Sequence, residues 1–353
     1  MKNPLAFAFL QEGAIRKPRA LRPGDRVGIF SPSYPAASLF PQRLERSARS
    51  LATILQVETV ISPQTWLNSG FTAGSAYQRA RALLDFIEDD SIKAIFCATG
   101  GFNSSELLPF LDTQAVRSQP KIILGYSDCC ALLCGLQAIA GWCTFHGPTL
   151  LPQFGEYPEP LQYTIEYLRK TIMEPSPRLE ILDPDGWTDE RLDWAGTEWM
   201  TRARRLATTS TREIWREGTG TGQLFGGNIE TINFLIGTPY LALPKEIVLF
   251  WEATEEEAAL PRIQRALAQF AHSGILDRTR AMLIGRSPHC APFGGVSLRD
   301  VVMQQVSEFN FPVLANLAFG HTDPMFTLPV GIPATVVATP KQGTVSIEEA
   351  GVL

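Results

Sequence analysis

The stretch Lys121-Ile122-Ile123-Leu124-Gly125-Tyr126-Ser127-Asp128 decides the fold of this chain. It starts with an apolar run typical of a buried strand, ends at a glycine, and is followed at once by a helix-like segment over residues 129–142. A strand, a sharp turn carrying a serine and then a helix form a nucleophile elbow. Such an elbow would expose the Ser127 hydroxyl above a sheet edge, near the partial positive charge of a helix N-terminus.

Ser127 also has a simpler interpretation. The usual elbow pattern is G-x-S-x-G, and Cys129 stands where its last glycine is expected. Serine and aspartate are preferred at helix N-caps, so Ser127 and Asp128 can be explained as caps of the following helix. The spacing alone leaves both interpretations open, and motifs elsewhere in the sequence are needed to distinguish them.

The first half of the chain alternates strand and helix patterns. We predict strands at residues 25–31, 57–61, 92–97 and 122–124, and helices at residues 41–55, 76–87, 104–111 and from 129 onward. Strands that alternate with helices indicate a parallel sheet with right-handed crossovers. Ligands bind at the carboxyl ends of such strands, so Gly100-Gly101 and Ser127 are expected to share one crevice.

After a helix at about residues 160–173, strand and helix patterns fade until about residue 222. This long connector carries Trp187, Trp194, Trp199 and Trp215. These side chains can fasten the connector to the rest of the protein, or they can form an aromatic wall for part of a substrate. A connector of this length is usually functional or mobile.

The second half mixes strands and helices. Strands are expected at residues 246–251, 281–285 and 312–316, helices at 229–236, 258–273 and 298–309, and a hairpin at 334–348. Residues 218–222 and Gly226-Gly227-Asn228 lack the Gly-Lys-Ser/Thr of a phosphate loop, so a tight turn into a strand and a helix cap at Asn228 are predicted. We predict an α/β protein: an N-terminal parallel-sheet, Rossmann-like domain at 1–173, the connector at 174–221, and a smaller C-terminal α/β domain of mixed strands at 222–353.

Composition excludes several classes. The 353 residues are 45% hydrophobic with a net charge of −5, so neither disorder nor binding to nucleic acid or anionic membranes is expected. The apolar piece at residues 5–10 lacks the features of a signal peptide, no stretch is long enough to span a bilayer, and a cytoplasmic location is predicted. Cys130 and Cys134 would share a helix face, and Cys143 and His146 have CxxH spacing. Neither pattern is complete enough for a metal site, so core packing is expected.

Two further residues follow predicted strands. His321 lies just beyond the strand at 312–316, whereas the other histidines are placed at a surface (His272), in a proline-rich loop (His289) and at a structural turn (His146). Glu252 ends the apolar run Leu249-Phe250-Trp251, and a carboxylate there needs a partner because burying it alone is costly. A relay of Ser127 as nucleophile, His321 as general base and Glu252 as its orienting group is therefore the hypothesis.

An ordered set of motifs resembles the LD-carboxypeptidase family of serine peptidases, which also contains the microcin C immunity peptidases. The set includes the stretch around Ser127, Gly226-Gly227-Asn228, Leu249-Phe250-Trp251-Glu252, Phe319-Gly320-His321-Thr322-Asp323-Pro324 and Thr327-Leu328-Pro329-Val330-Gly331. It begins as early as Leu21-Arg22-Pro23-Gly24-Asp25 and covers nearly the whole chain.

The resemblance implies a Ser127–Glu252–His321 triad in a cleft between two domains, with backbone N–H groups of Gly101 and Asp128 as the oxyanion hole. It also implies a homodimer that needs no metal or other cofactor and acts on a small-molecule or short-peptide substrate. Candidate substrate-contacting residues are Gly100, Asn103, Ser104, Asn228 and Trp194.

Departures from the family pattern suggest the branch. Cell-wall enzymes of this family usually carry an arginine before the paired glycines, and Thr99 stands there. Without that cation the free carboxylate of a murein tetrapeptide loses an expected partner. Asn103-Ser104 and the tryptophan-rich connector resemble the microcin immunity branch instead. We therefore expect an amidase or carboxypeptidase acting on a modified peptide or peptidyl-nucleotide-like compound. Murein tetrapeptide recycling is the alternative, and an inactive ligand-binding relative is the alternative of another class.

Overall fold

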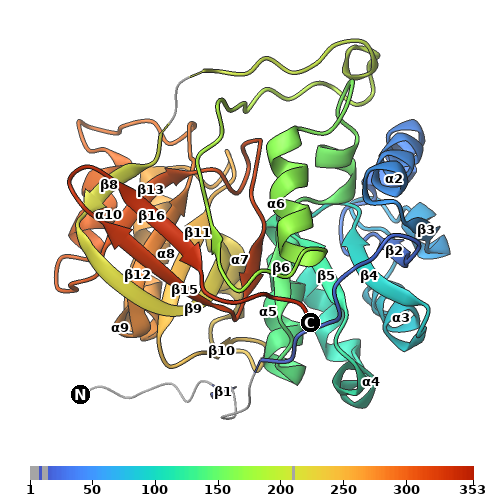
Figure 1. Cartoon of the computed structure of the whole chain (residues 1–353), viewed down its shortest axis with the longest axis horizontal. Coiled ribbons are helices and arrows are strands. Elements are labelled where there is room, and N and C mark those ends of the chain that lie inside the picture. Colours follow the sequence, from blue (N-terminus) through green and yellow to red (C-terminus); the bar gives the residue numbers. More distant parts are fainter. Residues whose placement is uncertain (1–7, 10–14, 209–210) are drawn as a thin grey trace.

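The computed structural model describes residues 8–9, 15–208 and 211–353, and these build two sheets side by side, each flanked by helices (Figure 1). The apolar piece at residues 5–10 falls mostly outside the described residues. None of the helices in the described ranges is long and apolar enough to cross a membrane.

The first sheet has the strand order β14-β6-β5-β4-β2-β3. Its strands are β2 (Arg26–Phe30), β3 (Glu58–Ile61), β4 (Ile92–Cys97), β5 (Ile122–Gly125), β6 (Thr144–His146) and β14 (Leu328–Val330). All neighbours run parallel except β14, which pairs antiparallel with β6. The predicted parallel sheet is confirmed, with two added strands: β6, which the sequence did not predict, and β14, from the C-terminal part of the chain.

Helices cover this sheet; those predicted near 41–55, 76–87, 129–142 and 160–173 are present, and two short helices at 36–39 and 113–118 were not predicted. The helices are α1 (Ala36–Leu39), α2 (Pro41–Leu55), α3 (Ala76–Glu88), α4 (Thr113–Ser118), α5 (Cys130–Ala140) and α6 (Gln162–Ile172), with short helical turns η1 (Pro63–Trp66), η2 (Ser104–Phe110), η3 (Ser127–Cys129) and η4 (Leu150–Phe154). In α2 the buried Leu44, Ala48, Leu51 and Leu55 recur at helical spacing. The expected helix at 104–111 is only the 3₁₀ turn η2, because Pro109 within it has no N–H for an α-helical bond.

The second sheet has the order β7-β16-β15-β9-β11-β12-β13-β8. Its strands are β7 (Leu179–Glu180), β8 (Glu213–Arg216), β9 (Gly218–Asn228), β11 (Ile247–Glu252), β12 (Thr279–Gly285), β13 (Val313–Leu317), β15 (Pro333–Ala338) and β16 (Gly343–Ile347). Neighbours β9, β11, β12 and β13 run parallel and the outer pairs antiparallel, so the predicted mixed sheet is confirmed.

The remaining elements complete this half. They are α7 (Ile229–Leu235), α8 (Leu260–His272), α9 (Ile275–Arg278) and α10 (Leu298–Gln305), and a two-stranded parallel pair of β1 (Ala8–Phe9) and β10 (Ala242–Leu243). Asn228 caps α7, as predicted: its side chain accepts a hydrogen bond from the Thr231 N–H.

The connector corrects one expectation. Residues 174–221 contain β7, β8 and the start of β9 as well as the turn η5 (Glu198–Met200), so they contribute to the second sheet instead of lying outside regular structure. The glycine-rich residues 218–222 are strand and not the expected tight turn. Glycines offer no alternating side chains, which is why the strand left no pattern in the sequence. Between β7 and β8 the connector arches over the upper edge of the molecule in Figure 1.

Candidate active site

Ser127 occupies a sharp turn after β5. Its φ of 61° lies in the left-handed region that non-glycine residues rarely adopt. An added Cβ at Gly125 would stand 2.7 Å from the Cys129 Cβ, so the turn needs glycine there. The turn η3 then leads into α5, which gives the strand–turn–helix geometry expected of an elbow.

Glu252 and His321 arrive from the second sheet. Glu252 is the last residue of β11 and is fully buried, and His321 lies on the loop after β13. Gly320 has a φ of 95°, and an added Cβ there would approach the Glu252 Cβ to 2.7 Å. The glycine therefore allows the histidine loop to pass directly over the carboxylate.

The three side chains form one chain of contacts. His321 Nδ1 lies 2.5 Å from Glu252 Oε2, and His321 Nε2 lies 3.1 Å from Ser127 Oγ. Burial alone would lower the pKa of His321, but the carboxylate of Glu252 outweighs it and the pKa is raised. In the neutral ring Nδ1–H donates to Glu252, which leaves Nε2 free to accept the hydroxyl proton of Ser127.

The other histidines do not reach Ser127 in this way. His146 is fully buried beside the rings of Tyr126 and Phe250, and burial lowers its pKa to about 4, so it is neutral near pH 7. Its expected place in a turn is wrong, since it is the last residue of β6. His272 is exposed, as predicted, and His289 lies in the predicted loop, where it is also exposed.

Gly100 and Gly101 both lie where an added side chain would crowd a neighbouring residue. An added Cβ at Gly100 would stand 3.2 Å from the Ser127 Cβ and 3.4 Å from the Asp128 backbone nitrogen. An added Cβ at Gly101, whose φ is 151°, would instead collide with Ser33 Oγ at 2.4 Å. Gly100 thus keeps the space beside the serine open, and Gly101 lets the loop pack on Ser33.

Asp128 and Ser104 support this loop. The Asp128 carboxylate is buried, its pKa is raised by that burial, and it accepts a hydrogen bond of 3.0 Å from the Ser104 N–H. Ser104 is fully buried and its hydroxyl donates to the Asp128 carbonyl. Asn103 donates to Glu106 at 3.2 Å. These contacts place Asn103 and Ser104 as supports of the loop that runs past Ser127.

Two cavities meet at Ser127 and His321. The larger, of about 460 Å³, extends under the connector and includes Trp194 and Trp199. The guanidinium of Arg43 lies 4.4 Å and 5.0 Å from these two rings, so the same tryptophans both fasten the connector and line a cavity. Trp187 and Trp215 line a separate surface hollow.

The smaller cavity, of about 190 Å³, lies on the other side of the serine. Asn228 contributes to its wall while donating a 2.7 Å hydrogen bond to Glu257. Its charged lining is mostly acidic, and Arg191 is the arginine among these residues. The acidic residues are Asp128, Glu230, Glu255, Glu256 and Glu257. Of the sequence-predicted contact residues, Gly100 and Trp194 therefore line the larger cavity and Asn228 the smaller.

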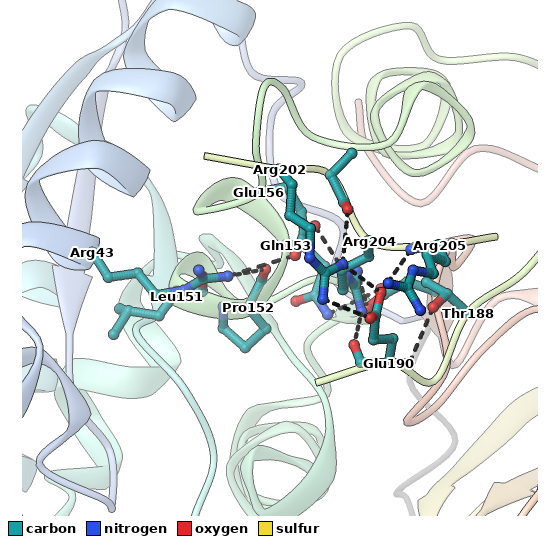
Figure 2. Close-up of polar contacts among 12 residues, drawn as sticks. Arg43, Leu151, Pro152, Gln153, Glu156, Thr188, Glu190, Arg202, Arg204 and Arg205 are labelled. Atoms are coloured by element: carbon teal, nitrogen blue, oxygen red, sulfur yellow. Dashed lines mark hydrogen bonds and ion pairs between the residues drawn. The ribbon is translucent and has the colours of Figure 1, made fainter. Parts of the chain in front are cut away.

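A polar network under the connector was missed by sequence reasoning. Figure 2 shows Arg204 between Glu156 and the connector backbone, and Arg43 against the carbonyl groups of Leu151 and Pro152. These residues come from segments far apart in the chain. The sequence shows that the connector contains several arginines, but it does not show which carboxylate each arginine pairs with.

The cysteines pack in the core as predicted: Cys130 and Cys134 are buried free thiols. Within the described ranges no group of three or more His, Cys, Asp or Glu side chains is placed to hold a metal ion.

Comparison with known proteins finds family, sequence and structural matches along most of the chain. Residues 27–147 match the LD-carboxypeptidase N-terminal domain and residues 221–336 match the LD-carboxypeptidase C-terminal domain. The microcin C7 self-immunity protein MccF of Escherichia coli is 30% identical over 319 residues, which cover 89% of this chain and 90% of that protein. A Bacillus subtilis protein named as a probable murein peptide carboxypeptidase is 28% identical, with 95% of each chain covered. The structure of MccF in complex with glutamyl sulfamoyl guanosine superposes with a TM-score of 0.88 at 28% identity, covering 96% of this chain and 99% of that one.

Proposed function

The chain belongs to the LD-carboxypeptidase family of serine peptidases, and on that premise we propose that it hydrolyses an amide bond with Ser127 as nucleophile, His321 as general base and Glu252 as the group that orients the histidine. The observation that carries this assignment is the continuous contact from Ser127 Oγ through the imidazole to the buried carboxylate, at 3.1 Å and 2.5 Å.

In the proposed mechanism Ser127 Oγ attacks the carbonyl carbon while His321 Nε2 takes its proton. The negative charge that develops on the carbonyl oxygen is stabilised by the backbone N–H groups of Asp128 and Gly101. His321 then returns the proton to the leaving amine, and an acyl-enzyme remains on Ser127. A water molecule, deprotonated by the same histidine, releases the acid and restores the serine.

We propose a modified peptide or a peptidyl-nucleotide-like compound as substrate. The larger cavity is lined by the aromatic rings of Trp194 and Trp199, which suit a flat ring such as a nucleobase, and by four arginine side chains among five carboxylates. The relative MccF has been solved with glutamyl sulfamoyl guanosine, a compound of this kind.

A murein tetrapeptide is the second candidate, and one observation favours it. The acidic lining of the smaller cavity would suit the ammonium group of a diamino acid next to the scissile bond. Turnover of an L-Lys–D-Ala or diaminopimelate–D-Ala peptide should be compared with that of an aminoacyl phosphoramidate nucleotide. Preference for the first by more than tenfold in kcat/KM would reverse our order of substrates.

The pH dependence of the reaction tests His321 as the base. An imidazole accepts a proton only when neutral, so kcat/KM should fall as the pH drops through the pKa of His321. Since that pKa is raised above its ordinary value of 6.5, the half-loss is expected above pH 6.5. Glu252→Gln removes the charge that raises the pKa and should move this limb to lower pH. A rate that stays constant down to about pH 5 contradicts the assignment.

Gly100→Ala tests the space beside the serine. The new methyl group would lie 3.3 Å from Ser127 Oγ, where substrate must approach, so we expect kcat/KM to fall about 10- to 100-fold with an unchanged unfolding midpoint. Gly196→Ala is the matched control, because an added Cβ there meets nothing closer than 3.5 Å. Equal rates in both variants would mean that this side of the serine is not used.

The oligomeric state and the cellular location are also proposals. From family membership we propose a homodimer that acts in the cytoplasm, built from domains at residues 1–173 and 222–353 joined by the connector. Light scattering during size-exclusion chromatography measures the mass in solution, and a monomer at micromolar concentration would refute the dimer.

A further inference from the structure

We propose that Arg204 is a positioning residue: it holds the loop that carries His321 against the half of the molecule that carries Ser127. This inference rests on the function proposed above, since it concerns how the same two groups are kept in reach.

Arg204 bridges two carboxylates from different parts of the chain. Its Nε lies 2.9 Å from Glu156 Oε2, and its Nη2 lies 2.8 Å from Asp323 Oδ2. Glu156 follows η4 in the first half, and Asp323 is two residues beyond His321. The three side chains are only 9–11% exposed. One guanidinium therefore joins the serine half to the histidine loop.

A second contact path continues to the serine itself. The Gln153 amide donates to Asp323 Oδ1 at 3.2 Å and to the Tyr126 hydroxyl at 3.3 Å. Tyr126 directly precedes Ser127, and its ring centroid lies 5.1 Å from that of His321. The path from Arg204 through Asp323 and Gln153 thus ends between the two reacting side chains.

The connector backbone holds Arg204 in place. Thr188 and Asp323 exchange two backbone hydrogen bonds, of 2.7 Å and 2.9 Å. Glu190 accepts a hydrogen bond of 2.8 Å from the Arg202 guanidinium and one of 2.7 Å from the Arg205 backbone N–H, which ties together the two connector segments beside Arg204 (Figure 2). The connector is therefore attached to the histidine loop by main-chain bonds and to the first half by Arg204.

Charge makes the bridge necessary. Burial disfavours the charged form of Arg204, but Asp323 and Glu156 outweigh it and raise its pKa, so the guanidinium stays protonated. Without this cation Asp323 would lose its ion pair and Glu156 would keep only its 3.5 Å contact to Arg43, so the two carboxylates would repel one another in a buried site. The loop with Asp323 would shift, and small errors in the alignment of reacting groups lower rates steeply.

The test measures alignment without substrate recognition. A small alkyl fluorophosphonate acylates a serine activated by its base, and it is too small to need the far wall of the cavity. We would compare the labelling rate, kcat and KM of the wild type, Arg204→Met, Arg204→Lys and Ser127→Ala. Arg205→Met is the matched control, because the Arg205 side chain is exposed and its contact to Glu190 is made by the backbone.

We expect Arg204→Met to be labelled about 10- to 100-fold more slowly and to lose kcat by a similar factor, with KM within about threefold. Arg204→Lys should recover part of both rates, and Arg205→Met should match the wild type. A merely structural role would lower the unfolding midpoint while leaving the labelling rate of the folded protein unchanged.

Two results would overturn the inference: wild-type labelling of Arg204→Met, or a change confined to KM, which would make Arg204 a substrate contact. Should Arg204→Met fail to fold, Glu156→Gln removes the other anchor and must slow labelling in the same direction. Equal labelling of wild type and Ser127→Ala would instead refute the proposed function. The Arg204→Met variant therefore tests the positioning role, and the Ser127→Ala variant tests the proposed function.

Discussion

Ser127→Ala is expected to abolish turnover, with kcat reduced by at least about 10⁴-fold. The proposed reaction passes through an ester on this oxygen, and alanine leaves only the oxyanion donors and substrate binding to act on a water molecule. Folding should be unaffected, because the hydroxyl is contacted by the His321 imidazole and not by the core. Steady-state hydrolysis and labelling by a fluorophosphonate both measure the loss.

The controls separate catalysis from general damage. Ser118→Ala removes an exposed hydroxyl at the end of α4 and should retain full activity. His321→Ala should be as inactive as Ser127→Ala, and the double variant should be no worse than either single one, since the two groups act as a unit. Turnover by Ser127→Ala within tenfold of the wild type would refute the mechanism. A wild type that binds a substrate but neither hydrolyses it nor reacts with the fluorophosphonate would favour the inactive ligand-binding relative.

Gly226→Ala is expected to give the largest loss of stability, at about 4 kcal/mol or more. An added Cβ at this position would lie 1.7 Å from the carbonyl oxygen of Phe250 in the neighbouring strand β11, and the φ of Gly226 is 154°. Neither backbone can yield without opening the centre of the second sheet, so the clash cannot be relieved by a side-chain rotation. Chemical denaturation measures the change in the free energy of unfolding.

Gly24→Ala is the control for this stability prediction. Gly24 has a φ of 88°, but an added Cβ there meets nothing within 4 Å, so only the backbone strain is tested. We expect a loss of about 1 kcal/mol for Gly24→Ala. An equally small loss for Gly226→Ala would mean that strand β9 does not depend on a glycine next to β11.

Much of the architecture could be predicted because many of its strands and helices have a hydrophobic pattern within their own sequence. The predicted bounds of the strand at 92–97 and the helix at 41–55 match the structure. The strand is an almost continuous apolar run buried on both faces, and in the helix apolar side chains recur at the spacing of one buried face. Ser127, Glu252 and His321 could be singled out because each lies at or shortly after the carboxyl end of a parallel strand, and such ends converge at the edge of a sheet.

Other features left no local pattern. The three residues of β14 join the first sheet although they come from the C-terminal part of the chain. β9 begins in a run of glycines, whose missing side chains carry no alternation. Pro109 turned an apparently helical stretch into η2, which a hydrophobic pattern alone does not exclude.

The amino-acid order by itself determined the strands and helices that have a clear hydrophobic pattern, the place of the serine turn, and the presence of an acid and a histidine at the ends of later strands. The tertiary structure alone decided that Glu252 and His321 meet across the seam beside Ser127, and that Arg204 pairs with Glu156 and Asp323. The physical reason is the separation in sequence of the residues that interact: helix and strand patterns depend on residues only a few positions apart. A buried charge instead takes whichever partner the packing of distant segments brings within hydrogen-bond reach.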